Sequence, residues 1–418
     1  MSNLVSEPVE ATRARDREVK EEARGASQIG PFDYCPRLGF REYWYPGTRS
    51  GNVGAKKPVR LKMLGEELVL FRGGDGAVVA LNDWCPHRGA RLSNGVCDFP
   101  GTITCPYHGY VFDDTGRCVA GLIEAENSTL APKMRAKRYP TAERHGIVFI
   151  WMGETAPVPL DEDLPWEFKD STLHPTRYTR VKVWETNWTE GVWQGIDYHE
   201  FYLHRSFKWW HLVHYKQPFF RPKPVVTNGV RILEEGDNYV TCTQEGVEYG
   251  QKEYPGLGKW PQHVWWRVLP RPNSPAGRFG WDHNVQLPSI VRVPLGASSH
   301  MRWGVPVDEW ETRMWTFTIV ERPRTRLRQL WQDLWYYLYR RGYGVIRINE
   351  KEDFPIFAKG EINVDIPQKL GILDVGVIYF RRHLARRARD FNRLGGARGC
   401  LKQPPDPRKV AEWAESAR

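Results

Sequence analysis

The sequence predicts an α+β protein in which a small all-β domain precedes a larger domain of antiparallel strands and helices. The first part of the prediction rests on residues 40–152, where short β-rich runs such as "VRLKMLGEELVLF" alternate with Gly, Pro and Asp turns. After the Pro-rich acidic stretch "ETAPVPLDEDLPW", alternating strand patterns are mixed with helical spacing, as in "RYTRVKVWETNWTEGVWQGIDYHEFYLH". The change of pattern across this stretch indicates two domains.

Four segments are expected along the chain. Residues 1–35 are polar and charged and predict a mobile N-terminal arm, and residues 36–158 form the β domain. Residues 159–395 form the larger domain, which includes the predicted amphipathic helix "RPRTRLRQLWQDLWYYLYRRG". Residues 396–418 form a C-terminal tail.

Composition restricts the classes of function. The 418 residues carry a formal net charge of +10, but the basic residues are spread out apart from 380–398, where helical spacing predicts a solvated helix face. No zinc finger, RNA-binding signature or basic zipper is present, so nucleic acid is not an expected partner. Seven cysteines, an odd number and mostly unclustered in a long chain, argue against a disulfide framework and for a reducing cytoplasm. Neither a secretory signal nor a run long enough to span a bilayer is expected.

Two short motifs in the β domain each combine a thiol with an imidazole. Cys85 and His87 lie two residues apart in "CPHRGA", and Cys105 and His108 lie three apart in "CPYHGY". Zinc fingers instead pair Cys with Cys and His with His. Because each motif contributes one Cys and one His, the pattern favours a diiron cluster in which one iron binds both thiolates and the other binds both imidazoles.

These motifs resemble the Rieske pattern Cys-x-His…Cys-x-x-His, and the likeness extends over the whole β domain. Rieske proteins of respiratory chains carry an additional disulfide in the two loops, whereas Ala90 and Tyr107 stand in those neighbourhoods here. The chain is therefore more similar to the Rieske non-haem iron oxygenases. Cys97 and Cys118 lie outside the ligand pattern and are expected to be packing residues.

A second group of candidate metal ligands follows in "NWTEGVWQGIDYHEFYLH". Non-haem iron enzymes that bind O₂ use two His and one carboxylate. His199 and His204 are candidates, and Asp197 precedes them. His211 and His214, in "WWHLVHYK", have no carboxylate at a suitable spacing and are interpreted as structural or substrate-facing residues.

This stretch resembles the oxygenase pattern Asn-Trp-x4-Glu-Gly/Asn-x-x-Asp-x-x-His-x4-His, to which it contributes Asn187, Trp188, Asp197, His199 and His204. Two departures matter. Trp193 stands where the family has Glu, and one residue is missing between the aspartate and the first histidine. A π-bulge would restore the geometry, whereas a regular helix would place Glu200 at the first ligand position.

The resemblance also implies a third ligand far downstream. The segment "NEKEDFPIFAKGEINVDIPQKLGILDVGVIYFRR" is similar to the end of the phthalate-dioxygenase-like branch, in which the iron aspartate precedes a Gly by seven residues. Asp353 and Gly360 have this spacing, so Asp353 is the expected ligand. Glu352 and Glu350 are the alternatives.

The resemblance implies the terminal oxygenase (alpha) component of a multicomponent system, with a helix-grip-like catalytic domain. Its expected cofactors are a Rieske [2Fe-2S] cluster and mononuclear Fe(II). Electrons would come from a reductase or ferredoxin, and O₂ would react with a small, aromatic or otherwise apolar substrate by hydroxylation or demethylation. Asp197 would bridge to His108 of a neighbouring subunit, so a trimer is expected. A Rieske electron-transfer protein with a non-catalytic binding domain is the alternative.

Overall fold

The computed structural model describes residues 35–124, 129–196, 229–236, 239–245, 283–294, 298–337 and 353–357, and residues 359, 368, 369, 374, 377, 379–381 and 387–389. The chain divides into two compact units. The N-terminal unit comprises Leu38–Lys169 with Val305–Glu309, and the large unit comprises the described parts of Met1–Arg37, Asp170–Gly304 and Trp310–Arg418. The segment boundaries expected from the sequence stay a prediction.

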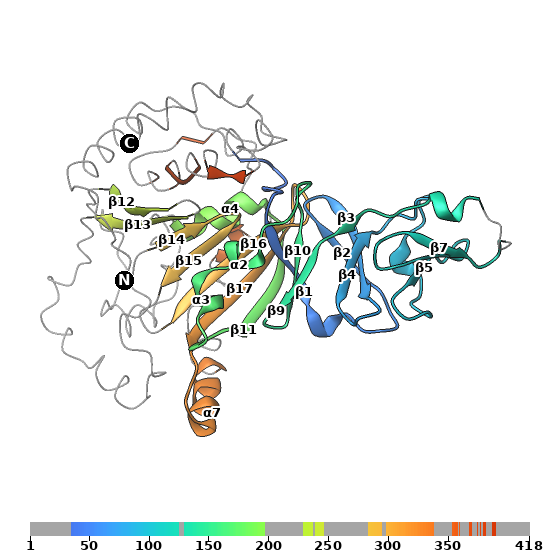
Figure 1. The fold of residues 1–418 in the computed structure, drawn as a ribbon. Helices are drawn as coiled ribbons and strands as arrows, with labels where there is room; N and C mark the ends of the chain where they lie inside the picture. The colour runs from blue at the N-terminus through green and yellow to red at the C-terminus, as the bar shows by residue number, and fades with distance from the viewer. Residues whose placement is uncertain are drawn as a thin grey trace, which may run out of the picture. The chain divides into compact units, whose positions relative to one another are not determined.

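Three small antiparallel sheets make up the N-terminal unit (Figure 1). The first has the order β1 (Trp44–Arg49), β10 (Ile147–Trp151), β9 (Thr141–Arg144). The second has the order β2 (Val59–Met63), β3 (Glu66–Arg72), β4 (Val78–Asn82), β8 (Arg138–Tyr139). The third has the order β5 (Ile103–Thr104), β6 (Tyr110–Phe112), β7 (Cys118–Gly121). Short helices connect or follow these strands: η1 (Ser50–Asn52), η2 (Leu92–Asn94), η3 (Ala131–Lys133), α2 (Leu160–Asp163) and α3 (Trp166–Lys169).

A tight hairpin sets the register of β2 and β3. Leu64 and Gly65 both have positive φ, of 49° and 77°, as the two central residues of a type I′ turn require. Met63 consequently pairs with Glu66, and the pairing continues along both strands. Pro306 and Val307 accept hydrogen bonds from the backbone of the turn at 2.8 and 3.0 Å, so Val305–Glu309 belongs to this unit although it is distant in sequence.

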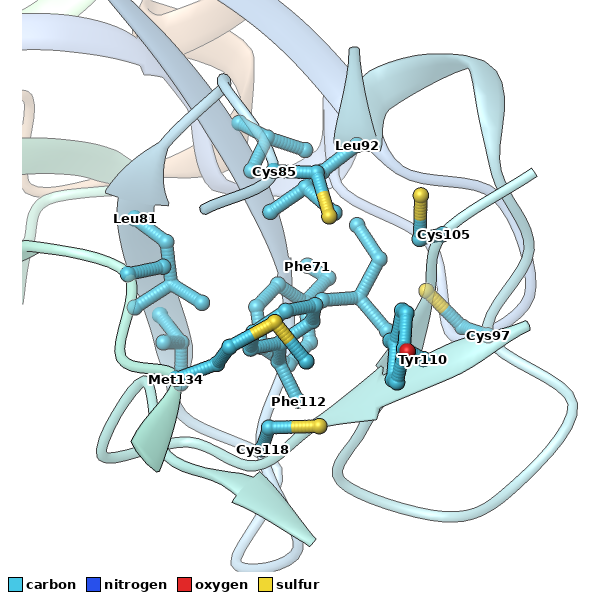
Figure 2. Close-up of a cluster of buried hydrophobic side chains, with 14 of the residues drawn as sticks. Phe71, Leu81, Cys85, Leu92, Cys97, Cys105, Tyr110, Phe112, Cys118 and Met134 are labelled. Atoms are coloured by element: carbon cyan, nitrogen blue, oxygen red, sulfur yellow. The ribbon is translucent and has the colours of Figure 1, made fainter. Parts of the chain in front are cut away.

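A buried cluster of hydrophobic side chains fills the space between the second and third sheets (Figure 2). Phe71 and Leu81 come from β3 and β4, and Tyr110 and Phe112 come from β6. Figure 2 shows Cys85 and Cys105 at one end of this cluster. The packed core therefore supports the two loops that carry the Cys and His motifs.

A seven-stranded antiparallel sheet forms the body of the large unit, in the order β11-β17-β16-β15-β14-β13-β12 (Figure 1). Its strands are β11 (Leu173–Trp184), β12 (Gly229–Glu235), β13 (Tyr239–Glu245), β14 (His283–Gln286), β15 (Ile290–Pro294), β16 (Ser299–Pro306) and β17 (Thr312–Glu321). All residues of β16 are buried, so both faces of the sheet are covered there. The helices of this unit are α4 (Trp188–Trp193), η4 (Gln194–Ile196), α7 (Arg326–Trp335) and α9 (Phe354–Phe357). No helix among the described residues is long and apolar enough to cross a membrane.

Helix α7 lies where the sequence predicts an amphipathic helix, and it contacts the sheet with both apolar and polar side chains. Asp333 receives two hydrogen bonds from Arg177 at 2.8 and 2.7 Å and one from the Tyr178 hydroxyl at 2.6 Å. Gln332 donates to the carbonyl of Glu321 at 2.9 Å. These bonds hold α7 against the ends of β11 and β17.

The ion pair of α7 predicts a loss of stability in acid. Hydrogen bonds from Arg177 and Tyr178 lower the pKa of Asp333 to about 2. Because the folded-state pKa lies below the unfolded value of about 3.9, the stabilisation is present above pH 4 and is lost as the pH falls to 2. The shift corresponds to ~2 kcal/mol, which solvent screening reduces to about 1 kcal/mol because the Arg177 side chain is 41% exposed.

We therefore expect Asp333→Asn to lower the melting temperature at pH 7 and to match the parent chain near pH 2. Thermal unfolding across this pH range measures the difference. Asp161→Asn is the control, because the side chains of Asp161 and Arg144 are 58% and 47% exposed and their ion pair should contribute almost nothing. Equal destabilisation by both variants would contradict the prediction.

Candidate functional site

The first Cys and His motif forms a closed loop after β4. The amide of Cys85 donates to the carbonyl of Ala90 at 2.8 Å, and the amide of Gly89 donates to the carbonyl of Cys85 at 2.9 Å. Gly89 has a φ of 72°, a conformation that other residues adopt only with strain. The loop therefore turns back on itself and presents the side chains between its ends on one side.

The second motif repeats this arrangement after β5. The amide of Cys105 donates to the carbonyl of Tyr110 at 2.8 Å, and the amide of Gly109 donates to the carbonyl of Cys105 at 3.1 Å. Gly109 has a φ of 67°. Two loops of the same conformation thus face each other, each with one Cys and one His.

The two histidines meet between the loops. Nδ1 of His87 lies 3.1 Å from Nδ1 of His108, and the ring centroids are 4.7 Å apart. Both side chains are half-buried. Each imidazole therefore directs the same nitrogen to a shared point, as two ligands of one metal ion do.

The two cysteine sulfurs form the matching pair. A hydrogen bond between them lowers the pKa of Cys105 to about 6 and raises the pKa of Cys85, because one proton is shared by two thiols. The backbone amides of His87 and Arg88 also point to the sulfur of Cys85, and those of Tyr107 and His108 point to that of Cys105. Amides aimed at a sulfur stabilise its thiolate form, which is the form that binds metal.

Two sulfurs and two nitrogens fit an iron–sulfur cluster better than a single zinc ion. In the part of the chain that the structure describes, no three His, Cys, Asp or Glu side chains gather as one ion would require. The four donors instead form a sulfur pair and a nitrogen pair. A cluster of two irons needs this division.

The carboxylate of Asp83 holds the first loop in place through hydrogen bonds. Its side chain is fully buried and accepts hydrogen bonds from the amide and hydroxyl of Ser93 at 2.6 and 2.8 Å and from Arg91 at 3.1 Å. The Arg91 guanidinium lies 4.0 Å from the centre of the Trp84 ring. Both ends of the loop are therefore tied to one carboxylate.

Loss of this anchor should weaken both the fold and the loop. We expect Asp83→Ala to lower the free energy of unfolding by ~3 kcal/mol, because Arg91 and Ser93 lose a buried charged partner. Iron and visible absorption per mole of protein should also fall. Asp113→Ala is the control, since Asp113 accepts three hydrogen bonds in the turn between β6 and β7 of the same unit. A variant of Asp83 with unchanged stability and iron content would contradict the anchoring role.

Tyr110 supports the histidine pair from β6. Its ring centroid lies 5.0 Å from that of His87, edge to face, and its hydroxyl donates to Glu124. The sequence reasoning missed both Asp83 and Tyr110 as supporting residues. Their positions beside the two motifs, in "NDWCPH" and "CPYHGY", are the signal that could have identified them.

None of the described cysteines is joined in a disulfide. Cys97 and Cys118 lie in the buried cluster, in agreement with the packing role expected for them. Burial raises the pKa of Cys97 to about 11, so this side chain stays protonated at neutral pH. No disulfide joins the two loops, because Ala90 and Tyr107 stand in those neighbourhoods.

Most of the second candidate group lies outside the described residues. This applies to the predicted iron ligands His199 and His204, to Asp197, and to the alternatives Glu200, Glu350 and Glu352, as well as His211 and His214. The predicted ligand Asp353 is described. It precedes α9, and only 2% of it is exposed.

The start of the second motif, with α4 and η4, is described up to Ile196. Asn187 accepts hydrogen bonds from the amide and hydroxyl of Thr189 at 3.1 and 3.0 Å, which starts α4. Trp193 ends this helix, where the oxygenase pattern has Glu. The guanidinium of Arg381 lies 5.1 Å from the centre of the Trp193 ring, so a cation–π contact occupies this position.

A family model of the Rieske [2Fe-2S] domain matches residues 43–131, the segment that holds both loops. Residues 43–131 are a Rieske [2Fe-2S] domain. The domain implies a [2Fe-2S] cluster, and the paired sulfur and nitrogen donors fit one. Outside this segment the match does not extend.

Two curated relatives that resemble this chain are oxygenase components of multicomponent enzymes. The terminal oxygenase component CarAa of carbazole 1,9a-dioxygenase from Sphingomonas sp is 34% identical over 172 residues, which cover 41% of this chain and 44% of the relative. The chain therefore matches less than half of the length of this relative. The oxygenase subunit of 5,5'-dehydrodivanillate O-demethylase from Sphingobium sp. is 25% identical over 394 residues, which cover 90% of this chain and 82% of the relative.

A solved structure shows that the likeness of fold extends beyond the Rieske domain. The reduced complex between oxygenase and ferredoxin of carbazole 1,9a-dioxygenase contains a chain with a TM-score of 0.62 at 21% identity. The match covers 93% of this chain and 96% of that chain. It confirms the predicted fold class, a Rieske β domain followed by a larger antiparallel-sheet domain with helices. The phthalate-dioxygenase-like branch stays a prediction.

Proposed function

We propose that the chain is the terminal oxygenase of a Rieske multicomponent system. The observation that carries the proposal is the combination of a paired sulfur and nitrogen site in the Rieske domain with a second unit that has the fold of oxygenase catalytic domains. A Rieske cluster alone transfers electrons, so a catalyst also needs a centre where O₂ reacts. The buried carboxylate of Asp353 supports such a centre in the large unit.

In this proposal Cys85 and Cys105 bind one iron of the cluster, and His87 and His108 bind the other. The cluster supplies one-electron chemistry at roughly −150 to +300 mV, because two neutral imidazoles replace two thiolates. The protein's part is to hold the four donors. It also directs backbone amides at the sulfurs and keeps the histidine nitrogens together.

His199, His204 and Asp353 are the proposed ligands of a mononuclear Fe(II), a set that leaves positions open for O₂. Asp197 is proposed as the carboxylate that bridges to His108 of a neighbouring subunit. It would orient the imidazole of His108 and that of a histidine at the mononuclear iron site. This role requires a ring of subunits, and we propose a trimer.

The proposed substrate is a small aromatic or other apolar compound, hydroxylated or oxidatively demethylated. The names of the two relatives, a dioxygenase and an O-demethylase, support this class. The proposed electron donor is a ferredoxin or reductase with an acidic surface, since the chain carries a net charge of +10. A cytoplasmic location is proposed because none of the described cysteines is joined in a disulfide.

Iron analysis and O₂ uptake together test the proposal. The purified chain should hold about three irons, two in the cluster and one mononuclear. With a reductant, O₂ uptake should depend on a member of a panel of aromatic acids, aryl methyl ethers and sterols. Two irons per chain and no substrate-dependent uptake would instead indicate a Rieske electron-transfer protein with a binding domain.

A further inference from the structure

Two tyrosines of the second motif, "CPYHGY", each contact one histidine of the paired site. Tyr110 is 3% exposed, and its ring meets that of His87 edge to face, as described above. Tyr107 contacts His108 instead. Their ring centroids are 3.7 Å apart and their planes are inclined by 29°, so the two rings are stacked. Each histidine therefore has an aromatic neighbour of its own.

Tyr107 lies at the surface, whereas Tyr110 belongs to the buried cluster. The Tyr107 side chain is 56% exposed. An exposed side chain changes its rotamer within nanoseconds unless other groups hold it. The position of the Tyr107 ring over His108 therefore depends on the groups that contact it at the surface.

Arg88, from the first loop, is a second neighbour of Tyr107. The guanidinium carbon of Arg88 lies 5.7 Å from the centre of the Tyr107 ring, within the range of a cation–π contact. Arg88 directly follows His87 in the sequence, and Tyr107 directly precedes His108. The contact therefore joins the two loops beside the histidine pair.

The backbone amides of Arg88 and Tyr107 have a separate task. The amide of Arg88 points to the sulfur of Cys85, and that of Tyr107 points to the sulfur of Cys105. A substitution that changes only the side chain keeps these amides. The contribution of the two side chains can therefore be tested apart from that of the backbone.

A stacked ring restricts the imidazole of His108. Rotation of the imidazole about its Cβ–Cγ bond would drive its edge into the Tyr107 ring, because the two ring centroids are only 3.7 Å apart. Groups that fix the ring orientation of a ligand histidine strengthen metal binding, and their loss costs roughly ten- to hundredfold in affinity. The stack has the geometry of such a restraint.

We propose that Tyr107, held by Arg88, is a positioning residue for His108. Its stacked ring fixes the orientation of this imidazole as a ligand of the Rieske cluster, and Tyr107 itself does not bind iron. The proposal rests on the ligand role proposed above for His108. It does not depend on the mononuclear iron or on the reaction with O₂.

Pulsed electron paramagnetic resonance of the reduced full chain tests the positioning role, because the hyperfine coupling of a ligand nitrogen depends on the orientation of its imidazole. Tyr107→Leu should shift the coupling of one histidine nitrogen and leave that of the other unchanged. Tyr107→Phe should keep the parent spectrum, since phenylalanine forms the same stack without the hydroxyl. Phe99→Leu is the matched control and should also keep it, since Phe99 is 46% exposed and lies outside both motifs.

The rate at which the cluster is lost to a ferrous chelator, followed by visible absorption, gives the size of the effect. Tyr107→Leu should lose the cluster at least about tenfold faster than the parent, the lower end of the range for supporting partners of metal ligands. Arg88→Met keeps the length of the side chain without its charge and should have a smaller effect. The double variant should be no faster than Tyr107→Leu alone, because Arg88 acts through Tyr107.

Three results would overturn the positioning role. The first is a parent-like nitrogen coupling and cluster lifetime in Tyr107→Leu. The second is a Tyr107→Phe variant that behaves like Tyr107→Leu, which would assign the effect to the hydroxyl and not to the stack. The third is an additive effect of Arg88→Met in the double variant, which would show that Arg88 does not act through Tyr107. A parent chain without a cluster spectrum would instead refute the ligand assignment, so the two failures are distinguishable.

Discussion

Cys105→Ser should abolish the Rieske cluster while the chain still folds. Cys105 is 1% exposed at the end of the buried cluster, and the amides of Tyr107 and His108 point to its sulfur and favour the thiolate. A serine hydroxyl is of similar size, but it stays protonated at neutral pH and is a poor ligand for a soft iron–sulfur centre. We expect iron to fall from about three to about one per chain and turnover to fall to background.

The visible absorption spectrum and iron content measure this loss. Cys97→Ser is the matched control, because Cys97 is another buried cysteine of the same hydrophobic cluster. Its pKa of about 11 keeps it a thiol, and we expect full cluster content in this variant. Retention of the cluster spectrum in Cys105→Ser, or its loss in Cys97→Ser, would show that the ligand assignment is wrong.

Asp353→Asn should remove the mononuclear iron and leave the Rieske cluster intact. Asp353 is almost completely buried before α9, and the amide has the size of the carboxylate without its charge. Loss of an anionic ligand should weaken Fe(II) binding by at least about a hundredfold, since even the supporting partners of metal ligands contribute ten- to hundredfold. Iron should fall from about three to about two per chain.

The cluster spectrum separates this outcome from general misfolding, because it should be unchanged in Asp353→Asn. O₂ uptake with substrate should disappear. Glu352→Gln tests the alternative ligand at the neighbouring position and is expected to keep all three irons. If Glu352→Gln loses the iron and Asp353→Asn retains it, the two acidic residues have been assigned in the wrong order.

The local sequence was sufficient to predict the Rieske domain. Cys and His at short spacing with a glycine after each pair imply two tight loops, and β-rich runs separated by turns imply the sheets that carry them. The contact between Nδ1 of His87 and Nδ1 of His108, at 3.1 Å, could not be read from the spacing. It depends on two loops far apart in the chain meeting over the same core.

The roles of Asp83 and Trp193 could be recognised only from the structure, for a similar reason. Asp83 is one of many aspartates, and its importance follows from burial together with hydrogen bonds to Ser93 and Arg91. Trp193 was recognised only as a departure from the oxygenase pattern. The structure explains it by a partner, Arg381, that lies almost two hundred residues further along the chain.

Helix α7 is an element whose position was predicted from the sequence but whose buried face was not. By itself the sequence predicted the four donors of the cluster, the order of the two domains and an amphipathic helix at the position of α7. Periodicity defines two faces of a helix, but it does not state which face is buried. Only the tertiary structure decided that the polar face turns inward, because Arg177, Tyr178 and the carbonyl of Glu321 offer Asp333 and Gln332 hydrogen bonds at the ends of β11 and β17. Trp335 and Tyr336 are buried on this inner side as well, against Tyr178 and Val320, whereas Leu327, Leu330 and Leu334 are left exposed.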